Sequence, residues 1–419
     1  MIKLLCNARL ADGRTVDVRV ADGFIESVRA SVVEQADPAD PAEVEVEDLS
    51  GWLLLPAMAE PHAHLDKALT AEEVPNPQGD LRGAINAWVT AAAAGVFTYE
   101  STVERAAAAM ELLLVHGVTA VRTHVNVLST NGTTSLRAVK EAALRFDGML
   151  DVQTVALTSS PMTGADAKEN RAALDAAVEE GVDLVGGCPH LDPDGAGLIR
   201  HALAVASDAG IGVDLHVDEM LDPSILTLRD YARQVIDTGF TGPVAAGHCV
   251  TLGMQPPSVQ LEVASLVAEA GIAVFPLPQT NLFLQGRDNA TATPRGLTAV
   301  AALQEAGALV AAGADNVQDP FNLVGRSDPL ETAALMVMAG HQLPDTAFDM
   351  VSNNVRKAIG LPEVHIRPGD PADLVAIDAP SVRAAIADAP MSRRVFRRGV
   401  LVASADQQSE IHGRGRNGS

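Results

Sequence analysis

The stretch Pro61-His62-Ala63-His64-Leu65-Asp66 directly follows an apolar run over residues 52–58. An apolar run that ends in His-x-His is typical of a buried strand, and strand side chains alternate with a period of two. The two imidazoles therefore lie on one side of the strand end, where they supply half of a divalent metal site. The carboxyl ends of parallel strands are where α/β barrels carry out their chemistry.

The chain beyond this stretch alternates apolar runs with alanine-rich helical patterns, many of which end at a glycine. Eight strands in such an alternation predict an α/β fold, a (β/α)8 barrel of the TIM type. The pattern alone leaves an open doubly wound sheet as the alternative. The predicted strands are residues 53–57, 120–125, 152–157, 184–187, 213–216, 244–247, 273–276 and 309–312.

Both chain ends have a different sequence pattern, with short segments of alternating apolar and polar residues and hairpin turns such as Asp12-Gly13 and Asp22-Gly23. We expect residues 1–55 and 364–403 to form one small β-sandwich domain. The barrel then occupies residues 56–363. The polar residues 404–419 are expected to be a disordered tail.

The composition narrows the class of protein. Hydrophobic residues make up 47% and charged residues 20% of the 419 residues, enough for a large core. The net charge of −24 disfavours nucleic acid and anionic membranes as partners. Three scattered cysteines, with no apolar segment of bilayer length and no signal peptide, indicate a cytoplasmic protein.

Further metal-binding and acid–base side chains stand at the ends of later predicted strands, namely His216, Glu219, His248 and Asp315. In a barrel these ends converge on one rim, so the imidazoles and the carboxylate meet around one Zn²⁺ or Fe²⁺ ion. Such an ion lowers the pKa of a bound water from 15.7 to about 7. Glu219 or Asp315 is then placed to move the proton to a leaving group.

Several motifs occur in one order along the chain: residues 61–66, Arg122-Thr123-His124-Val125, His216-Val217-Asp218-Glu219, Gly247-His248, residues 281–287, and Gly313-Ala314-Asp315-Asn316 followed by Asp319-Pro320-Phe321. In these motifs the chain resembles the cytosine deaminase group of the amidohydrolase superfamily. That group includes enzymes that act on other amino-substituted heterocycles and on N-alkylated s-triazines.

The resemblance implies a role for each matching residue. His62, His64, His216 and Asp315 would bind one metal ion, and Glu219 would be the proton shuttle. His248 would orient or polarise the attacking water. Two-metal amidohydrolases carry a bridging lysine after the fourth strand, and residues 185–188 contain none, which favours one metal. The resemblance also suggests a homo-oligomer.

The predicted function is hydrolytic deamination of a small amino-substituted N-heterocycle, with metal-bound hydroxide attacking an sp2 ring carbon. Cytosine itself is disfavoured, because the family's Phe-Pro-Gln-Glu-Gly segment is replaced by Leu157-Thr158-Ser159-Ser160-Pro161. Release of an alkylamine, or hydrolysis of an amide, would use the same ligands. A non-catalytic scaffold is the alternative of another class. The predicted substrate contacts are Ser159, Gln285, Phe321, His124 and Trp88.

Overall fold

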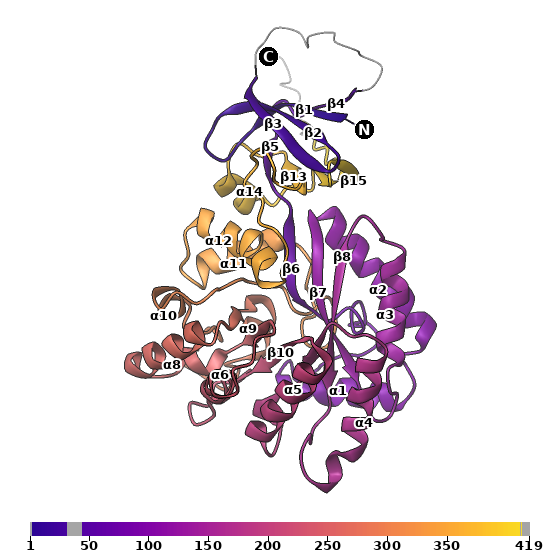
Figure 1. The fold of residues 1–419 in the computed structure, drawn as a ribbon, viewed down its shortest axis with the longest axis vertical. Helices are drawn as coiled ribbons and strands as arrows, with labels where there is room; N and C mark the ends of the chain where they lie inside the picture. Colours follow the sequence, from indigo (N-terminus) through magenta and orange to yellow (C-terminus); the bar gives the residue numbers. More distant parts are fainter. Residues whose placement is uncertain (1, 32–43, 411, 413–419) are drawn as a thin grey trace, which may run out of the picture.

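The computed structural model describes residues 2–31, 44–410 and 412 of the chain. Within these residues the strands form two sheets, a parallel one rolled into a nearly closed barrel and a second one built from both chain ends (Figure 1). The chain-end sheet lies at one pole of the molecule, with the barrel and its helices below it in this view. The predicted barrel with a small β domain is confirmed.

The barrel sheet contains only parallel pairs, and each strand neighbours the next in sequence. Almost all of its residues are buried, as expected for a parallel sheet covered by helices. Its strands, among the residues described, are β6 (Met58–Ala63), β7 (Val118–Val127), β8 (Asp151–Thr158), β9 (Leu184–Gly186), β10 (Gly212–Val217), β11 (Val244–His248) and β12 (Ala273–Phe275).

The eighth place of the barrel, between β12 and β6, is filled by an irregular segment. Val310 bridges Val274, and Asp315 bridges Ala63, each as an isolated parallel bridge. The prediction of a regular strand at 309–312 is therefore wrong. The reason is local, because the backbone N–H of Ala312 donates to the carbonyl of Met350 at 2.7 Å instead of to a neighbouring strand.

Helices surround the barrel and follow most of its strands (Figure 1). Gly210 and Gly239 end two of them with φ of 68° and 63°, a left-handed conformation that glycine adopts without strain. The helices in the described residues are α1 (Leu81–Ala93), α2 (Tyr99–Val115), α3 (Thr134–Leu144), α4 (Lys168–Glu179), α5 (Gly195–Ala209), α6 (Thr227–Thr238), α7 (Val250–Gly253), α8 (Pro257–Glu269), α9 (Pro278–Leu284), α10 (Val300–Glu305), α11 (Pro329–Met338), α12 (Pro344–Met350), α13 (Asn353–Ala358) and α14 (Val382–Asp388).

The chain-end sheet has its own core, in which Leu5, Val18 and Ile25 pack with Leu374 and Phe396 from the other end of the chain. This shared core is why the two ends fold as one unit. Its strands are β1 (Ile2–Arg9), β2 (Thr15–Ala21), β3 (Phe24–Ala30), β4 (Val44–Asp48), β5 (Leu53–Pro56), β13 (Leu374–Ile377), β14 (Arg393–Arg397) and β15 (Val400–Ala405).

The prediction that residues 53–57 form the first barrel strand is wrong. β5 pairs antiparallel with β13 in the chain-end sheet, and the first barrel strand is β6, which begins at Met58. One unbroken apolar run thus contains two strands of different sheets, and hydrophobic periodicity does not distinguish the sheets. At the other end, β15 extends two residues into the predicted tail, part of which lies outside the described residues.

A buried ion pair ties the chain-end sheet to the barrel helices. Both guanidinium Nη atoms of Arg393, in β14, donate to the carboxylate of Asp328, at 2.9 and 2.7 Å. Asp328 also caps α11 by accepting from the N–H of Leu330. Arg393 is fully buried, so this contact fixes β14 against the start of α11.

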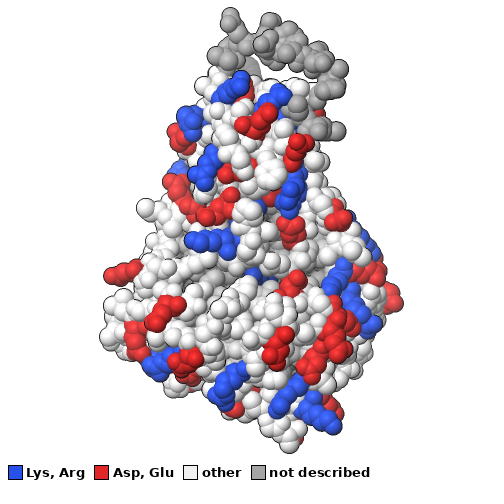
Figure 2. Space-filling model, in the orientation of Figure 1, with Lys and Arg blue, Asp and Glu red and all other residues white. Residues whose placement is uncertain are grey.

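Acidic and basic side chains are interspersed over the face seen in Figure 2, although acidic residues outnumber basic ones in the whole chain. In the portion of the chain that the structure describes, no helix has the length and apolarity that crossing a membrane requires.

Candidate metal centre

Three imidazoles and one carboxylate meet at the carboxyl end of the barrel. The Nε2 atom of His216 lies 3.1 Å from that of His62 and 3.0 Å from that of His64. Asp315 Oδ1 lies 3.2 Å from His64 Nε2 and 3.7 Å from His62 Nε2. The structure thus brings together the four predicted ligands: His62 lies in β6, His64 directly follows it, His216 lies in β10, and Asp315 lies in the segment after β12.

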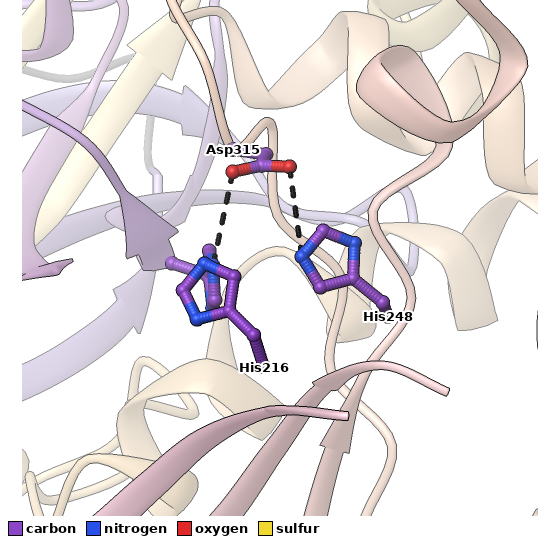
Figure 3. A group of neighbouring side chains, drawn as sticks. His216, His248 and Asp315 are labelled. Atoms are coloured by element: carbon purple, nitrogen blue, oxygen red, sulfur yellow. Dashed lines mark hydrogen bonds and ion pairs between the residues drawn. The ribbon is translucent and has the colours of Figure 1, made fainter. Parts of the chain in front are cut away.

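His248, the last residue of β11, adds a fourth imidazole to the cluster. Its Nε2 lies 3.9 Å from Asp315 Oδ2, and Figure 3 shows this ring and His216 on the two sides of the carboxylate. One ligand atom each from His62, His216, His248 and Asp315 lies within 4.8 Å of all the others. His64 joins this group through its short distances to His216 and Asp315.

The buried environment keeps these imidazoles neutral, which is the form that binds metal. Burial and the positive charge of neighbouring groups hold the pKa of His62 and His216 well below the usual value. Burial followed by the charge of Lys67 lowers the pKa of His64. Both oxygens of Asp315 and the Nε2 of His248 are buried and have no hydrogen-bond partner among the residues that the structure describes. This donor set fits a divalent cation such as Zn²⁺ or Fe²⁺.

Hydrogen bonds on the far side of two rings fix their orientation. His64 Nδ1 donates to the backbone carbonyl of His124 at 3.2 Å, and His248 Nδ1 donates to Oδ1 of Asn281 at 3.1 Å. In each ring the Nε2 lone pair then faces the cluster. Asn281 lies in α9, so the helix after β12 positions a ring on β11.

The backbone at the cluster is unusual at two of these residues. His248 and Asp315 have φ of 66° and 68°, a left-handed conformation that residues other than glycine rarely adopt. Such strain concentrates at functional sites, where surrounding contacts hold it. Gly247 has a separate role, because a Cβ there would lie 2.7 Å from the ring of His62.

Glu219 lies beside His248, between the cluster and a cavity. Its Oε2 is 3.7 Å from His248 Nε2, and burial raises the pKa of Glu219 to about 7. The cavity has a volume of about 710 Å³ and is lined by Glu219, Gln285 and the start of α1 around Arg82. Gln285 is held there by donating to the backbone carbonyl of Glu219 at 3.0 Å.

A second cavity, of about 510 Å³, opens at the amino ends of the barrel strands around Lys357. It lies at the opposite end from the cluster of imidazoles, so it is not the site of their chemistry.

Lys67 places a positive charge next to the cluster, and its side chain is buried. Its Nζ lies 4.7 Å from the ring centroid of Phe321 and 5.7 Å from that of Trp88. These distances are typical of cation–π contacts. Against the effect of burial, the neighbouring imidazoles of His64 and His248, and after them the charge of Lys67, lower the pKa of Asp315. Lys67 was not among the predicted substrate contacts.

The predicted substrate contacts lie in different surroundings. Gln285 lines the cavity beside Glu219. Phe321 and Trp88 contact Lys67, which lies next to the cluster. His124 is fully buried with its ring centroid 4.0 Å from that of His62, so it packs behind a predicted ligand. Ser159 directly follows β8, is half-buried and is not part of the cavity lining.

Two groups that support the cluster were not predicted from the sequence. Glu60 accepts hydrogen bonds from the backbone N–H of His62 and of Ala314, both at 3.0 Å. Asp214, two residues before His216 in β10, accepts from Arg122 at 2.9 Å. Glu60 stands at the same period-two spacing as the two histidines after it, which is the signal that points to it.

Comparison with known proteins identifies the family. Residues 100–404 match the amidohydrolase family. The chain is 32% identical over 391 residues to a pterin deaminase from Rhizobium rhizogenes, which covers 92% of this chain and 87% of that protein.

Solved structures agree with this assignment. A 5-methylcytosine deaminase from Klebsiella pneumoniae, liganded with 5-fluorocytosine, has a TM-score of 0.86 at 28% identity, covering 98% of this chain and 99% of that one. An N-isopropylammelide isopropylaminohydrolase from Burkholderia multivorans has a TM-score of 0.82 at 25% identity, covering 96% and 98%. The predicted resemblance is confirmed: the chain belongs to the amidohydrolase family and is an enzyme that hydrolyses carbon–nitrogen bonds.

Proposed function

We propose that the protein is a hydrolytic deaminase that uses one divalent metal ion, Zn²⁺ or Fe²⁺, and removes the amino group of a pterin-like heterocycle. The observation that carries the proposal is the meeting of His62, His64, His216 and Asp315 beside the Glu219–His248 pair. The name of the Rhizobium relative supports the choice of ring.

His62, His64, His216 and Asp315 would hold the ion, which when bound lowers the pKa of water to about 7 and so supplies a nucleophile. His248 would accept a hydrogen bond from the attacking water at Nε2, because its Nδ1 proton is already donated to Asn281. Glu219 would carry one proton of the water to a ring nitrogen, and then a second proton, from the hydroxyl of the addition product, to the amino group, which leaves as ammonia. A carboxyl whose pKa is about 7 is suited to such a transfer at neutral pH.

Lys67 would bind the edge of the ring away from the amino group. Its ammonium is held over Phe321 and Trp88, and no side-chain hydrogen bond from its Nζ occurs among the described residues. It is therefore free to donate to an oxo oxygen of the substrate. Pterin carries such an oxygen on C4, which one ring nitrogen separates from its amino-substituted carbon C2, and this agrees with the role for Lys67.

The cavity beside Glu219 supports a substrate larger than a single six-membered ring. Its volume of about 710 Å³ lies within the range of roughly 300–1,000 Å³ that is usual for small-molecule sites. The second ring of a pterin would extend along Gln285 towards the start of α1 around Arg82. Reduced, unpaired cysteines and the absence of a membrane-crossing helix in the described residues are consistent with a cytoplasmic enzyme, which is part of the proposal.

The test is an assay of ammonia release from pterin, 5-methylcytosine, cytosine and N-isopropylammelide by protein loaded with Zn²⁺ or Fe²⁺. Release from pterin that is abolished by a chelator and restored by the ion supports the proposal. Release of isopropylamine from N-isopropylammelide would instead indicate an alkylamine-releasing enzyme. Ring opening without release of an amine would indicate an amide hydrolase.

A further inference from the structure

Glu60 lies where the barrel closes, between β6 and the irregular eighth segment. It is 2% exposed, and each of its two carboxylate oxygens accepts one backbone N–H. One of these N–H groups belongs to His62, and the other belongs to Ala314, the neighbour of Asp315. The carboxylate thus joins the backbone beside two of the ligands.

Regular sheet pairing is missing at this place. The β6–β7 register shifts between Glu60 and Ala63, so His62 has no pairing partner in β7. Pro61 has no N–H to contribute. A buried N–H without an acceptor is costly, and Glu60 supplies the acceptor for His62 from its own strand.

Across the barrel closure, in the irregular eighth segment, Asp315 has a left-handed φ of 68°. Two backbone contacts hold it. Its own N–H donates to the carbonyl of His62 at 3.0 Å, and the N–H of Ala314 donates to Glu60. Gly313 leaves room for the carboxylate, because a Cβ at this position would lie 2.3 Å from Glu60 Oε1. These contacts hold a conformation that costs about 1–3 kcal/mol when nothing supports it.

We infer that Glu60 is a positioning residue of the metal centre, which sets the distance between His62 and Asp315 through the backbone. The inference rests on the proposed metal site. The two hydrogen bonds of 3.0 Å from the backbone N–H groups of His62 and Ala314 to its carboxylate are the contacts that carry this role. Glu60 makes no contact with the substrate cavity, so its effect is on the geometry of the ligands.

Two variants test this role. Glu60→Gln keeps the size of the side chain but places an NH2 group against one of the two backbone N–H donors. Gly313→Ala keeps Glu60 but displaces its carboxylate, and Gly313 does not have the positive φ that would strain an alanine. Asp183→Asn is the matched control, because Asp183 also accepts a backbone N–H and a hydroxyl from Thr154 at the far end of the barrel.

The measurements are the dissociation constant for Zn²⁺, by competition with a chelating dye, and the visible absorption spectrum of the Co²⁺-loaded protein. We expect Zn²⁺ binding to weaken by about 10–100-fold in Glu60→Gln, the cost typical of groups that orient metal ligands. The Co²⁺ bands should change in Glu60→Gln and in Gly313→Ala. The double variant should bind Zn²⁺ little more weakly than either single variant. Asp183→Asn should lower only the melting temperature.

Zn²⁺ binding by Glu60→Gln within twofold of wild type, with unchanged Co²⁺ bands, would overturn the inference and leave the proposed function intact. A wild-type chain that binds neither ion would overturn both. If Glu60→Gln does not fold, the Co²⁺ spectrum of Gly313→Ala decides the question in the same way.

Discussion

The Nε2 atoms of His62 and His216 lie 3.1 Å apart in a fully buried setting. Burial and like-charged neighbours disfavour protonation of both rings, so no charge draws them together. Two nitrogens bound at about 2.0–2.1 Å to one tetrahedral ion are separated by roughly 3.3–3.4 Å. The distance between these rings is therefore close to that of two ligands of a single metal ion.

Metal removal should inactivate the enzyme and destabilise it. An ion present at a thousandfold excess over its dissociation constant adds about 4 kcal/mol to the free energy of unfolding. We expect thermal unfolding to shift to lower temperature after dialysis against a chelator, and activity to return with one ion per chain.

A ligand variant checks the same point. His216→Ala should lose both the bound ion and the thermal response to it, whereas His201→Ala, in α5, should keep both. Full occupancy in His216→Ala would contradict the assignment of this ring as a ligand.

Replacing the proposed proton shuttle should separate chemistry from metal binding. Glu219→Gln removes the ionisable group but keeps the shape, so we expect a normal metal content and a fall in kcat of about 10²–10⁴-fold. Steady-state kinetics with metal analysis measures this. Glu262→Gln, which affects only exposed pairs with Arg229 and Arg233, is the control and should behave as wild type. Unchanged kcat in Glu219→Gln would rule out the role.

Lys67→Met should reveal how the substrate is recognised. Methionine keeps the length of the side chain but removes the ammonium, and a hydrogen bond to a charged group contributes about 1.5–3 kcal/mol. We expect kcat/KM for pterin to fall roughly 10–100-fold, and to fall less for an analogue without the oxo oxygen.

The control is Lys140→Met, since Lys140 donates on the surface to the carbonyls of Glu180 and Gly181, far from the cluster. An equal loss for pterin and for the analogue would show that Lys67 does not read the oxo group.

The buried pair between Arg393 and Asp328 should dominate the attachment of the chain-end sheet. Arg393→Met leaves the carboxylate of Asp328 buried without its cation, which typically costs about 3–5 kcal/mol. Urea unfolding measures this loss. Arg394→Met, next in the chain and paired with the exposed Asp406, should cost no more than about 1 kcal/mol. Similar losses in both variants would mean that burial of the pair is unimportant.

The barrel could be predicted from the sequence, because apolar runs, helical patterns and the glycines that end helices are local features. The grouped side chains could also be predicted, because the carboxyl ends of the strands of a barrel meet at one rim. These side chains are His62, His64, His216, His248 and Asp315. Their grouping in space follows from that rule, and their roles as ligands stay a prediction until metal is measured.

The sequence was least informative about contacts that follow neither the hydrophobic periodicity nor the order of the strands along the chain. The run over residues 52–58 looks like one strand, but Leu53–Pro56 pairs with β13 far along the chain. His124 ends up behind His62 and not in the cavity, because rotation of the strand decides which way its ring faces.

The sequence by itself determined the fold class and the set of side chains available to a metal ion, since both depend on local pattern and strand order. Only the tertiary structure decided how these side chains are held. Glu60 in β6 accepts a hydrogen bond from Ala314 in the eighth segment, and Asn281 in α9 accepts one from His248 in β11. Each of these hydrogen bonds joins segments that are distant in sequence, and the packing of the closed barrel alone brings them within bonding distance.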